Sequence, residues 1–495
     1  MKTKLLSLFA LALMLCACSH DDPTYRFDEA AGVCTLIEGD YAGALDIPAQ
    51  VERDGKTYRV DSIADGALSG CTSLKSIALP EGLRYVGSNA FEGCSSLEQV
   101  SLPQSVETLG ANAFSGCKRL KEIALPSALK NIEIGSFVGC TSLEKVSLPD
   151  SLATIGMNAF KGCTALAAVN LPASLRSIGD MAFWDCARLG ELTLPDSLKS
   201  IGSNAFNGCK GLKEIAIPAG LNDLSKGVFP NCENLERITV SPENEAYCDI
   251  DGVLFLKDKS QLVQYPANHG ATYEVPKETE RIGVSAFAYS RKLEAVSLPK
   301  GLYKIGRNAF RGCSGLKEIV IPKGVRTIAR NAFSGCAALE RVEFECSYPE
   351  MSARIFEDCT SLREVVLPDS LEEIEDLLFK GCSSLAEINL PATVKEIGYG
   401  AFSDCTALKS ITLPASVEEI GRSAFSGCSK LEGVHMLSFW PPKLGAEAFD
   451  FHYVILYVQR GMRLTYLQEA EAYRQFQRIR EADVFSPRQK ASSLP

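Results

Sequence analysis

Residues 97–119 read LEQVSLPQSVETLGANAFSGCKR, and the same spacing of apolar residues returns along most of the chain. The clearest mark of this repeat is a phenylalanine every 23 residues, in two series on either side of one interruption. The two series are Phe91, Phe114, Phe137, Phe160, Phe183, Phe206 and Phe229, then Phe287, Phe310, Phe333, Phe356, Phe379, Phe402 and Phe425. A unit of this length cannot bury its apolar side chains alone, so successive units must stack around one continuous core. The sequence therefore predicts a solenoid of 23-residue coils.

Each coil is expected to contain two short extended stretches. Val100 and Leu102 alternate with polar residues, which is the period of a half-buried strand, so each coil supplies one strand to a parallel sheet. Pro103 has no amide hydrogen and therefore closes that strand. Residues 106–110 read as the second extended stretch, which ends at a glycine.

A short helical or 3₁₀ turn is expected to complete the coil. Asn112 precedes Ala113 and Phe114, and an asparagine at this place could accept a hydrogen bond from an amide one turn further on, as helix N-caps do. The turn would carry Phe114 and Cys117 into the core.

The cysteines are expected to be structural. Most of the 19 occupy one register, three residues after the aromatic position. They are Cys71, Cys94, Cys117, Cys140, Cys163, Cys186, Cys209, Cys232, Cys313, Cys336, Cys359, Cys382, Cys405 and Cys428. Parallel side chains on adjacent coils rarely meet the dihedral angle of a disulfide, and one cysteine per coil does not give the close pairs that structural zinc needs. We interpret these residues as buried, unreactive thiols, and Cys34, Cys248 and Cys346 have no assigned role.

Residues 143–163 fit the pattern L-x-x-I-x-L-P-x-x-L-x-x-I-G-x-x-A-F-x-G-C without a gap, and similar units cover most of the chain. This pattern resembles the leucine-rich repeats of the BspA type, which are found in bacterial and some protozoan surface proteins. The resemblance implies a β-rich α/β fold, a right-handed leucine-rich-repeat solenoid whose strands form one long parallel sheet. It also implies adhesion, with the rod binding proteins or the host extracellular matrix.

Departures from the repeat predict one insertion and two caps. Phe229 and Phe287 are 58 residues apart, twelve more than two periods, and residues 251–256 and 261–266 alternate like the strands of a β-hairpin. After the last coil the apolar spacing becomes helical, which predicts a terminal amphipathic helix. The predicted parts are a signal peptide at 1–17, a lipidated linker at 18–32, an N-terminal cap at 33–73, a solenoid at 74–451 with the β-hairpin insertion at 241–276, a C-terminal cap at 452–485 and a disordered tail at 486–495.

The first residues are typical of an exported protein. Lys2 and Lys4 precede an apolar run that is shorter than the roughly 20 residues of a bilayer span, as in a signal peptide. Residues 15–18, LCAC, resemble a bacterial lipobox, and the resemblance implies cleavage before Cys18 and lipidation of its thiol. The alternative is an ordinary signal peptide with an incidental cysteine. The acidic residues that follow resemble the export signal of Bacteroides-type lipoproteins, so we expect an outer-membrane, lipid-anchored protein at the cell surface.

Charge and titratable residues favour neither nucleic-acid binding nor catalysis. The formal net charge is −10, whereas nucleic-acid-binding proteins gather Lys and Arg on one face. None of the four histidines lies at metal-ligand spacing from another, and no phosphate-binding glycine motif or nucleophile elbow occurs. We predict no catalytic residue, no metal, no cofactor and a monomer. An enzyme is a further hypothesis, weighed third after the two binding roles given below. It would need a cleft with convergent titratable groups at residues 241–276.

The irregular coils supply the candidate contact residues. The outward central column of the regular strands is small, as at Ala78 and Ser101, and gives no platform for stacking on sugars. Tyr348, Phe439 and Trp440 lie beside proline in coils that lack the Leu-Pro unit. We predict that they bind a partner, because Trp and Tyr are enriched among binding hot spots. The alternative is that each aromatic ring fills a local gap.

Two functional hypotheses follow. The first is a non-catalytic, lipid-anchored cell-surface protein whose rod binds proteins or host matrix. The second is a glycan-binding accessory lipoprotein of polysaccharide uptake, in which Trp440 would hold the sugar.

Overall fold

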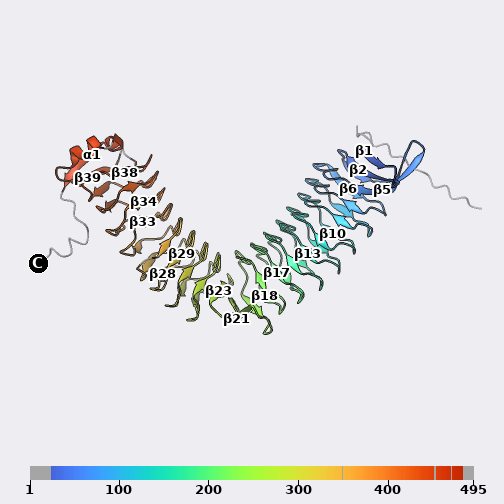
Figure 1. The fold of residues 1–495 in the computed structure, drawn as a ribbon, viewed down its shortest axis with the longest axis horizontal. Helices are drawn as coiled ribbons and strands as arrows, with labels where there is room; N and C mark the ends of the chain where they lie inside the picture. The colour runs from blue at the N-terminus through green and yellow to red at the C-terminus, as the bar shows by residue number, and fades with distance from the viewer. Residues whose placement is uncertain (1–23, 348, 451–452, 470, 483–495) are drawn as a thin grey trace, which may run out of the picture.

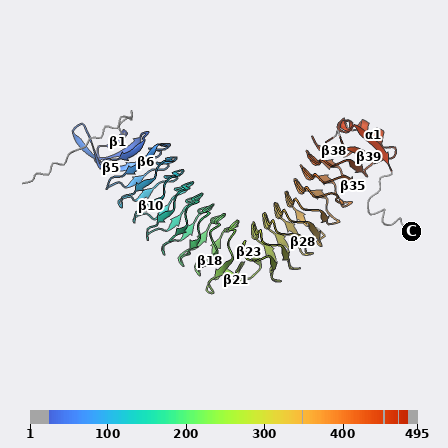
Figure 2. The same cartoon turned by 180° about the vertical axis from the view of Figure 1, so that it is seen from behind.

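The computed structural model describes residues 24–347, 349–450, 453–469 and 471–482. Its coils stack into two arms, one blue to green and one yellow to red, which meet at an angle near β21 (Tyr247–Ile250) (Figure 1). The view from behind shows the same arms with β1 (Thr24–Asp28) and α1 (Arg463–Glu469) at opposite tips (Figure 2). The predicted signal peptide, Cys18, Tyr348 and the predicted tail lie outside the described residues.

The Leu-x-x-Ile segments form the first column of strands, and strands of neighbouring coils pair in parallel. In the N-terminal arm they are β6 (Leu74–Ala78), β8 (Gln99–Ser101), β10 (Glu122–Ala124), β12 (Lys145–Ser147), β14 (Ala168–Val169), β16 (Glu191–Leu192), β18 (Glu214–Ile217) and β20 (Arg237–Val240). In the C-terminal arm they are β24 (Thr272–Glu274), β26 (Ala295–Ser297), β28 (Glu318–Ile321), β30 (Arg341–Phe344), β32 (Glu364–Val366), β35 (Ser410–Leu413), β37 (Gly433–Met436), β39 (Ile455–Gln459) and β40 (Arg478–Ala482).

The second extended stretch of each coil forms a second column of two-residue strands. In the N-terminal arm they are β7 (Tyr85–Val86), β9 (Thr108–Leu109), β11 (Asn131–Ile132), β13 (Thr154–Ile155), β15 (Ser177–Ile178), β17 (Ser200–Ile201) and β19 (Asp223–Leu224). In the C-terminal arm they are β25 (Arg281–Ile282), β27 (Lys304–Ile305), β29 (Thr327–Ile328), β31 (Glu350–Met351), β33 (Glu373–Ile374), β34 (Glu396–Ile397), β36 (Glu419–Ile420) and β38 (Lys443–Leu444).

Strand register confirms the 23-residue coil, since Ile132 pairs with Ile155 and Ile155 with Ile178. The solenoid with parallel sheets is therefore as predicted. The sheet is not continuous, however, because the first column divides into sheets of two to four strands. The second column forms longer sheets, of which two have five and seven strands.

The predicted helical turn is wrong. Asn112 has φ of 53°, in the left-handed region, and residues 111–116 form successive turns. Amides of this segment donate across coils, from Asn112 to the Ile134 carbonyl at 2.8 Å and from Phe114 to the Ser136 carbonyl at 2.8 Å. Because these amides serve the neighbouring coil, they cannot make the bonds of a helix, and Asn112 is not an N-cap.

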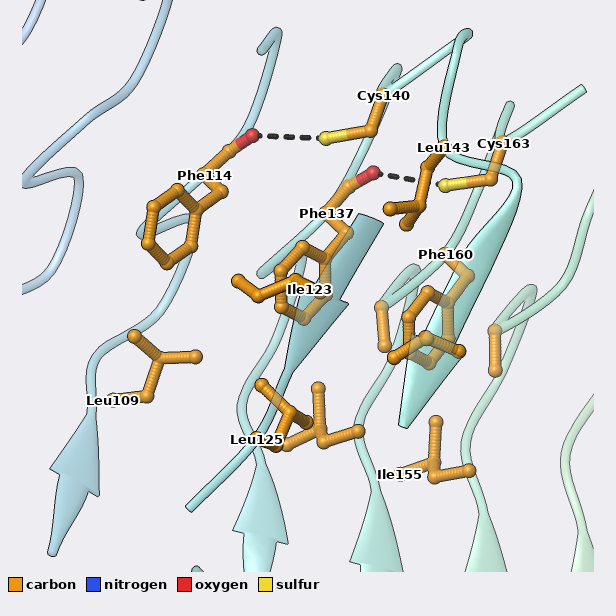
Figure 3. Packing of buried hydrophobic residues seen from close by; sticks show 14 of the residues in the cluster. Leu109, Phe114, Ile123, Leu125, Phe137, Cys140, Leu143, Ile155, Phe160 and Cys163 are labelled. Atoms are coloured by element: carbon orange, nitrogen blue, oxygen red, sulfur yellow. Dashed lines mark hydrogen bonds between the residues drawn. The ribbon is translucent and has the colours of Figure 1, made fainter. Parts of the chain in front are cut away.

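Phenylalanine rings stack through the middle of each arm (Figure 3). The rings of Phe114 and Phe137 lie 5.7 Å apart with an interplanar angle of 1°, and those of Phe137 and Phe160 lie 5.3 Å apart. All three residues are fully buried. This packing confirms that residues one period apart are spatial neighbours.

The cysteine column is buried and free of disulfides over the described residues. From Cys117 onward each thiol of the column donates to a phenylalanine carbonyl of the preceding coil, as Cys140 does to Phe114 at 3.1 Å and Cys163 to Phe137 at 3.2 Å (Figure 3). Burial raises the pKa of the Cys140 thiol to about 12. The prediction of buried structural thiols is thus correct, and the thiol–carbonyl ladder is an additional finding.

The insertion forms a three-stranded antiparallel unit. β22 (Val253–Leu256) pairs with β23 (Gln261–Gln264), which is the predicted hairpin, and also with β21. β23 then pairs in parallel with β25 and so starts the second column of the next arm. β21 was missed because its sequence, YCDI, carries only a weak alternation.

The insertion also divides the core. Leu254 packs into the core of the N-terminal arm, whereas Val253 and Phe255 pack into that of the C-terminal arm. β22 therefore gives alternate side chains to two cores. The arms are tied by an ion pair between Glu233 and Arg291 at 3.3 Å and by the Asn268 amide, which donates to the Leu235 carbonyl at 2.8 Å.

Both ends of the solenoid are closed by extra strands. At the N-terminus β1 pairs antiparallel with β2 (Val33–Glu38), and β4 (Gln50–Arg53) pairs antiparallel with β5 (Lys56–Ile63). β3 (Gly43–Asp46) pairs in parallel with β6. Residues 24–28, expected in the linker, thus belong to the folded end of the chain.

The C-terminal cap is only partly helical. α1 and the 3₁₀ helix η1 (Glu471–Gln475) occupy the segment with the predicted helical spacing. The strand β40 follows and pairs in parallel with β39, which the helical pattern did not predict. Over the described residues, no helix has the length and apolar content needed to cross a bilayer.

A substitution of Gly156 tests how closely successive coils approach each other. A Cβ at this residue would lie 2.8 Å from the Ile132 carbonyl oxygen and 3.0 Å from the Glu133 carbonyl carbon, both backbone atoms. We expect Gly156→Ala to reduce the free energy of unfolding by about 1–3 kcal/mol, because the backbone must shift. Urea unfolding of the full chain measures this. Gly301→Ala is the control, since its nearest neighbour is the Lys277 carbonyl oxygen at 3.7 Å, and an equal loss in both variants would contradict the argument.

Thiol labelling tests the cysteine ladder. In the folded protein we expect iodoacetamide to leave Cys140 and Cys163 unmodified, because burial keeps them protonated and out of reach. The half-buried Cys248 should be alkylated before them. Mass spectrometry of the digested protein gives the order of labelling, and labelling in urea shows that every site can react. Rapid native labelling of Cys140 would contradict the packing.

Candidate binding surface

The C-terminal end exposes several large apolar side chains. The exposed fractions are 60% for Phe439, 70% for Trp440, 79% for Tyr453 and 66% for Leu464. Phe439 and Trp440 lie in the loop between β37 and β38, where the usual Leu-Pro pair is missing. At these fractions neither ring fills a gap in the core, so that alternative is wrong for both residues. Their role in binding stays a prediction.

The loop that carries Phe439 and Trp440 is fixed by the cap. The Tyr466 hydroxyl donates to the Ser438 carbonyl at 2.9 Å, and the Tyr473 hydroxyl donates to the Pro442 carbonyl at 2.9 Å. Both tyrosines are fully buried, and burial raises the pKa of Tyr466 to about 12. The two exposed rings therefore project from a loop anchored on both sides, which lowers the entropy lost when a partner binds.

A second aromatic pair lies on the outward face of the last strands. The rings of His435 on β37 and Tyr457 on β39 stack at 4.5 Å with an interplanar angle of 5°. Both residues are half-buried, and they are register partners in adjacent strands. The sequence did not predict this pair because the coil before β39 is irregular, so the 23-residue interval does not lead from His435 to Tyr457.

Open grooves run along the outward face of the N-terminal arm. Three adjoining grooves of about 570, 410 and 720 Å³ extend from β3 to β14. Their lining includes Ala78, Ser101 and Ser147, with Glu122 and Lys145 between them. This agrees with the predicted small central column, and the grooves contain no aromatic ring on which a sugar could stack.

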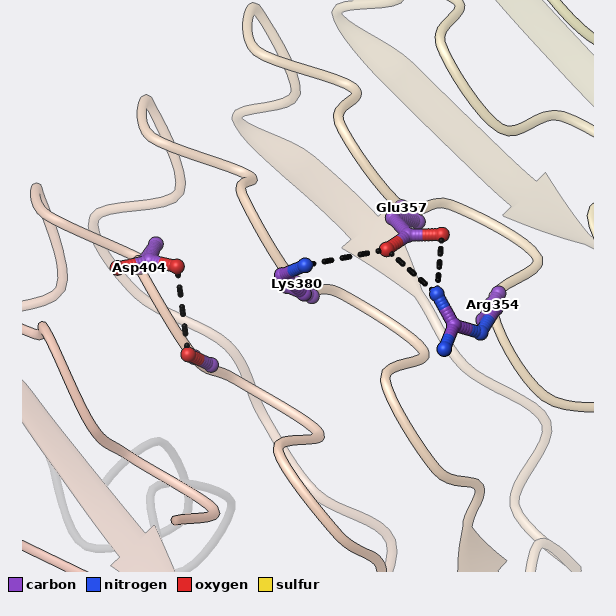
Figure 4. A network of polar contacts seen from close by, with 5 residues as sticks. Arg354, Glu357, Lys380 and Asp404 are labelled. Atoms are coloured by element: carbon purple, nitrogen blue, oxygen red, sulfur yellow. Dashed lines mark hydrogen bonds and ion pairs between the residues drawn. The ribbon is translucent and has the colours of Figure 1, made fainter.

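Glu357 forms the centre of a charged cluster in the C-terminal arm. Glu357 accepts from Arg354 at 3.0 Å and from Lys380 at 3.3 Å, and its carboxylate is largely buried (Figure 4). Arg354 takes the place of the usual asparagine, with φ of 63°. The network joins two neighbouring coils and leaves no free acid or base, so we interpret it as structural.

A column of carboxylates lies on the second strands. Glu373, Glu396 and Glu419 are register partners in β33, β34 and β36, and Glu419 pairs with Lys443 at 2.7 Å. Beside this column, burial and the neighbouring carboxylates raise the pKa of Glu375 to about 7. Perturbed carboxyls can mark active sites, but no group of three His, Cys, Asp or Glu in the described part of the chain is arranged to hold a metal.

The comparisons agree with this architecture. A family model described as "BspA type Leucine rich repeat region (6 copies)" matches residues 56–166, 130–249, 280–405 and 349–469. A comparison with curated protein sequences finds no match.

Two crystal structures show similar solenoids. A leucine-rich repeat protein from Eubacterium ventriosum is 29% identical over 63% of this chain and 84% of that chain, with a TM-score of 0.58. A leucine rich cell surface protein from Faecalibacterium prausnitzii is 25% identical over 84% of this chain and 96% of that chain, with a TM-score of 0.51.

The carboxylate column predicts a pH-dependent stability. Glu375 has a folded-state pKa of about 7, above its ordinary value of 4.5, so the folded protein holds a proton that the unfolded chain releases between these values. Stability should be greatest below about pH 4.5 as far as this group is concerned, and should fall as the pH rises to about 7. At pH values above this window, Glu375→Gln should raise the melting temperature. The variant's melting temperature should also depend less on pH than that of the parent protein.

Thermal unfolding of the full chain on both sides of the window measures the effect. Glu81→Gln, at an exposed carboxylate of the N-terminal arm, is the control for loss of one negative charge. A Glu375→Gln profile parallel to that of the parent protein would show that Glu375 does not carry the dependence.

Proposed function

Because the chain belongs to the BspA-type leucine-rich repeat family, we propose that it is a non-catalytic, lipid-anchored surface protein that binds proteins or host matrix. The observation that carries the proposal is the pair Phe439 and Trp440, held outward by a loop that buried tyrosines anchor. Leucine-rich repeat proteins generally serve as binding scaffolds without catalysis, and a similar solved structure is named as a cell surface protein. Exposed aromatic residues on a fixed loop suit protein recognition.

The anchor in this proposal is Cys18. It follows the apolar leader in a sequence that resembles a lipobox, so its thiol would carry the lipid after cleavage. One thioether-linked lipid together with an acylated amine would provide the two hydrophobic signals that stable membrane attachment needs. Outer-membrane placement with the rod at the cell surface belongs to the same proposal.

Glycan capture is the second candidate. The observation that favours it is the indole of Trp440, which is 70% exposed, because a free indole face can stack on a sugar ring. The protein would then be an accessory lipoprotein of polysaccharide uptake. A Trp440→Ala variant that loses glycan binding but keeps protein binding would favour this candidate.

Paired substitution tests the protein-binding role. We expect cells that display Phe439→Ala/Trp440→Ala to adhere to immobilised matrix proteins at least about tenfold more weakly than the parent strain, because two hot-spot rings are removed. Tyr399→Ala is the matched control, since Tyr399 is an aromatic residue of a regular coil and is 49% exposed. Equal adhesion of the paired variant and the control would remove these residues from the proposal.

Substitution of Cys18 tests the anchor. Cys18→Ala should abolish incorporation of a labelled fatty acid and move the protein from the membrane fraction to the soluble one. Protease treatment of intact cells should release the rod from the parent strain. A parent protein that resists shaving yet is labelled would be attached on the inner side, which contradicts surface display but not lipidation.

A further inference from the structure

The outward face of the last sheet combines an aromatic pair with arginines. β35, β37, β39 and β40 are paired in that order, so their outward residues form columns across the sheet. One column runs through Thr412, His435, Tyr457 and Arg480, which are successive register partners. Arg478 lies two residues before Arg480 on the same strand, and both arginines are exposed.

Neither arginine is neutralised by a neighbour. No ion pair joins Arg478 or Arg480 to any residue in the described part of the chain. Glu481, the acidic residue of β40, is directed to the cap, where its carboxylate accepts from the Arg463 amide at 3.2 Å. Residues i and i+2 of a strand point to one side at a spacing of about 7 Å, so Arg478 and Arg480 present two positive charges together. The chain as a whole carries a formal charge of −10, so this pair is a local exception.

We propose that this face, defined by Thr412, His435, Tyr457, Arg478 and Arg480, binds a polysaccharide that carries carboxylate or sulfate groups. A guanidinium group donates two parallel hydrogen bonds to such an acid, which gives direction as well as attraction. The Tyr457 and Thr412 hydroxyls lie in the same column as Arg480 and supply hydrogen-bonding groups for sugar hydroxyls.

The composition of the face favours an acidic sugar chain over an acidic peptide. A peptide of comparable affinity would bury apolar side chains as well, and none of the strongly exposed apolar residues lies in this column. The stacked pair of His435 and Tyr457 instead places polar groups beside the charges. Binding of an acidic polysaccharide at this face does not require that Phe439 and Trp440 bind a protein. Either binding role can therefore be disproved without the other.

Binding of the full chain to defined polymers tests the site. Affinity electrophoresis with dextran sulfate and polygalacturonate should retard the protein, whereas neutral dextran should not. Arg478→Ala/Arg480→Ala should weaken retardation by the acidic polymer at least about tenfold, because two charge-assisted contacts are removed. Retardation should also weaken with added salt. Arg478→Lys/Arg480→Lys should lose only part of the affinity, since charge remains but the paired hydrogen bonds do not.

The control separates this site from general charge effects. Arg326→Ala/Arg363→Ala removes two exposed arginines from regular coils of the same arm and should leave binding unchanged. Equal weakening by the control pair would overturn the proposal, as would retardation by neutral dextran. Tighter binding to poly-L-glutamate than to either acidic polysaccharide would make the face a site for acidic peptides. Unchanged melting temperatures of the variants show that binding, not folding, is measured.

Discussion

Core side chains pack against their own equivalents one coil away, and the rest of the structure depends on this stacking. Phe137 lies between Phe114 and Phe160 at 5.7 and 5.3 Å. The Phe114 carbonyl accepts both the Cys117 amide at 3.2 Å and the Cys140 thiol at 3.1 Å, so one atom joins its own turn to the next coil. A shift of one residue would break the ring stack and the thiol bond together. In the coils that carry the cysteine, register is therefore fixed by packing and by directional bonds.

The repeat made the stacking predictable, because residues that must meet have the same type at a fixed interval. The phenylalanine and cysteine columns and both strand columns follow from that interval, and the hairpin at β22 and β23 lies where the interval is interrupted. The conformation around Asn112 could not be predicted from the interval. Its amide donates to another coil, and no pattern within one coil reveals that partner. The stacked pair of His435 and Tyr457 was not predicted for a related reason, since an irregular coil separates the two residues.

The junction between the arms shows what happens where the repeat stops. The thiol ladder ends at Cys232 and restarts at Cys313, and Ser290 takes the cysteine position between them. Its buried hydroxyl has no hydrogen-bond partner among the described residues, nor has Oε1 of the nearby Gln264. Since β22 supplies side chains to both cores, the arms meet through the insertion rather than through a regular coil. In a solenoid each coil is stabilised by contacts with its neighbours, so the insertion must supply the contacts that a regular coil would make at this point.

The same constraint explains where recognition can develop. Inward positions must match their neighbours on both sides, and many outward positions of the regular coils are small or paired across coils, as Lys317 is with Glu294 at 2.6 Å. A terminal strand has a neighbour on one side only, so β40 can place Arg478 and Arg480 on its face without matching a following coil. The irregular coil next to it is likewise free to hold Phe439 and Trp440 outward. Outward residues of varied chemistry therefore concentrate at the end of the rod. The regular coils set how far that end lies from the N-terminus and how it is oriented.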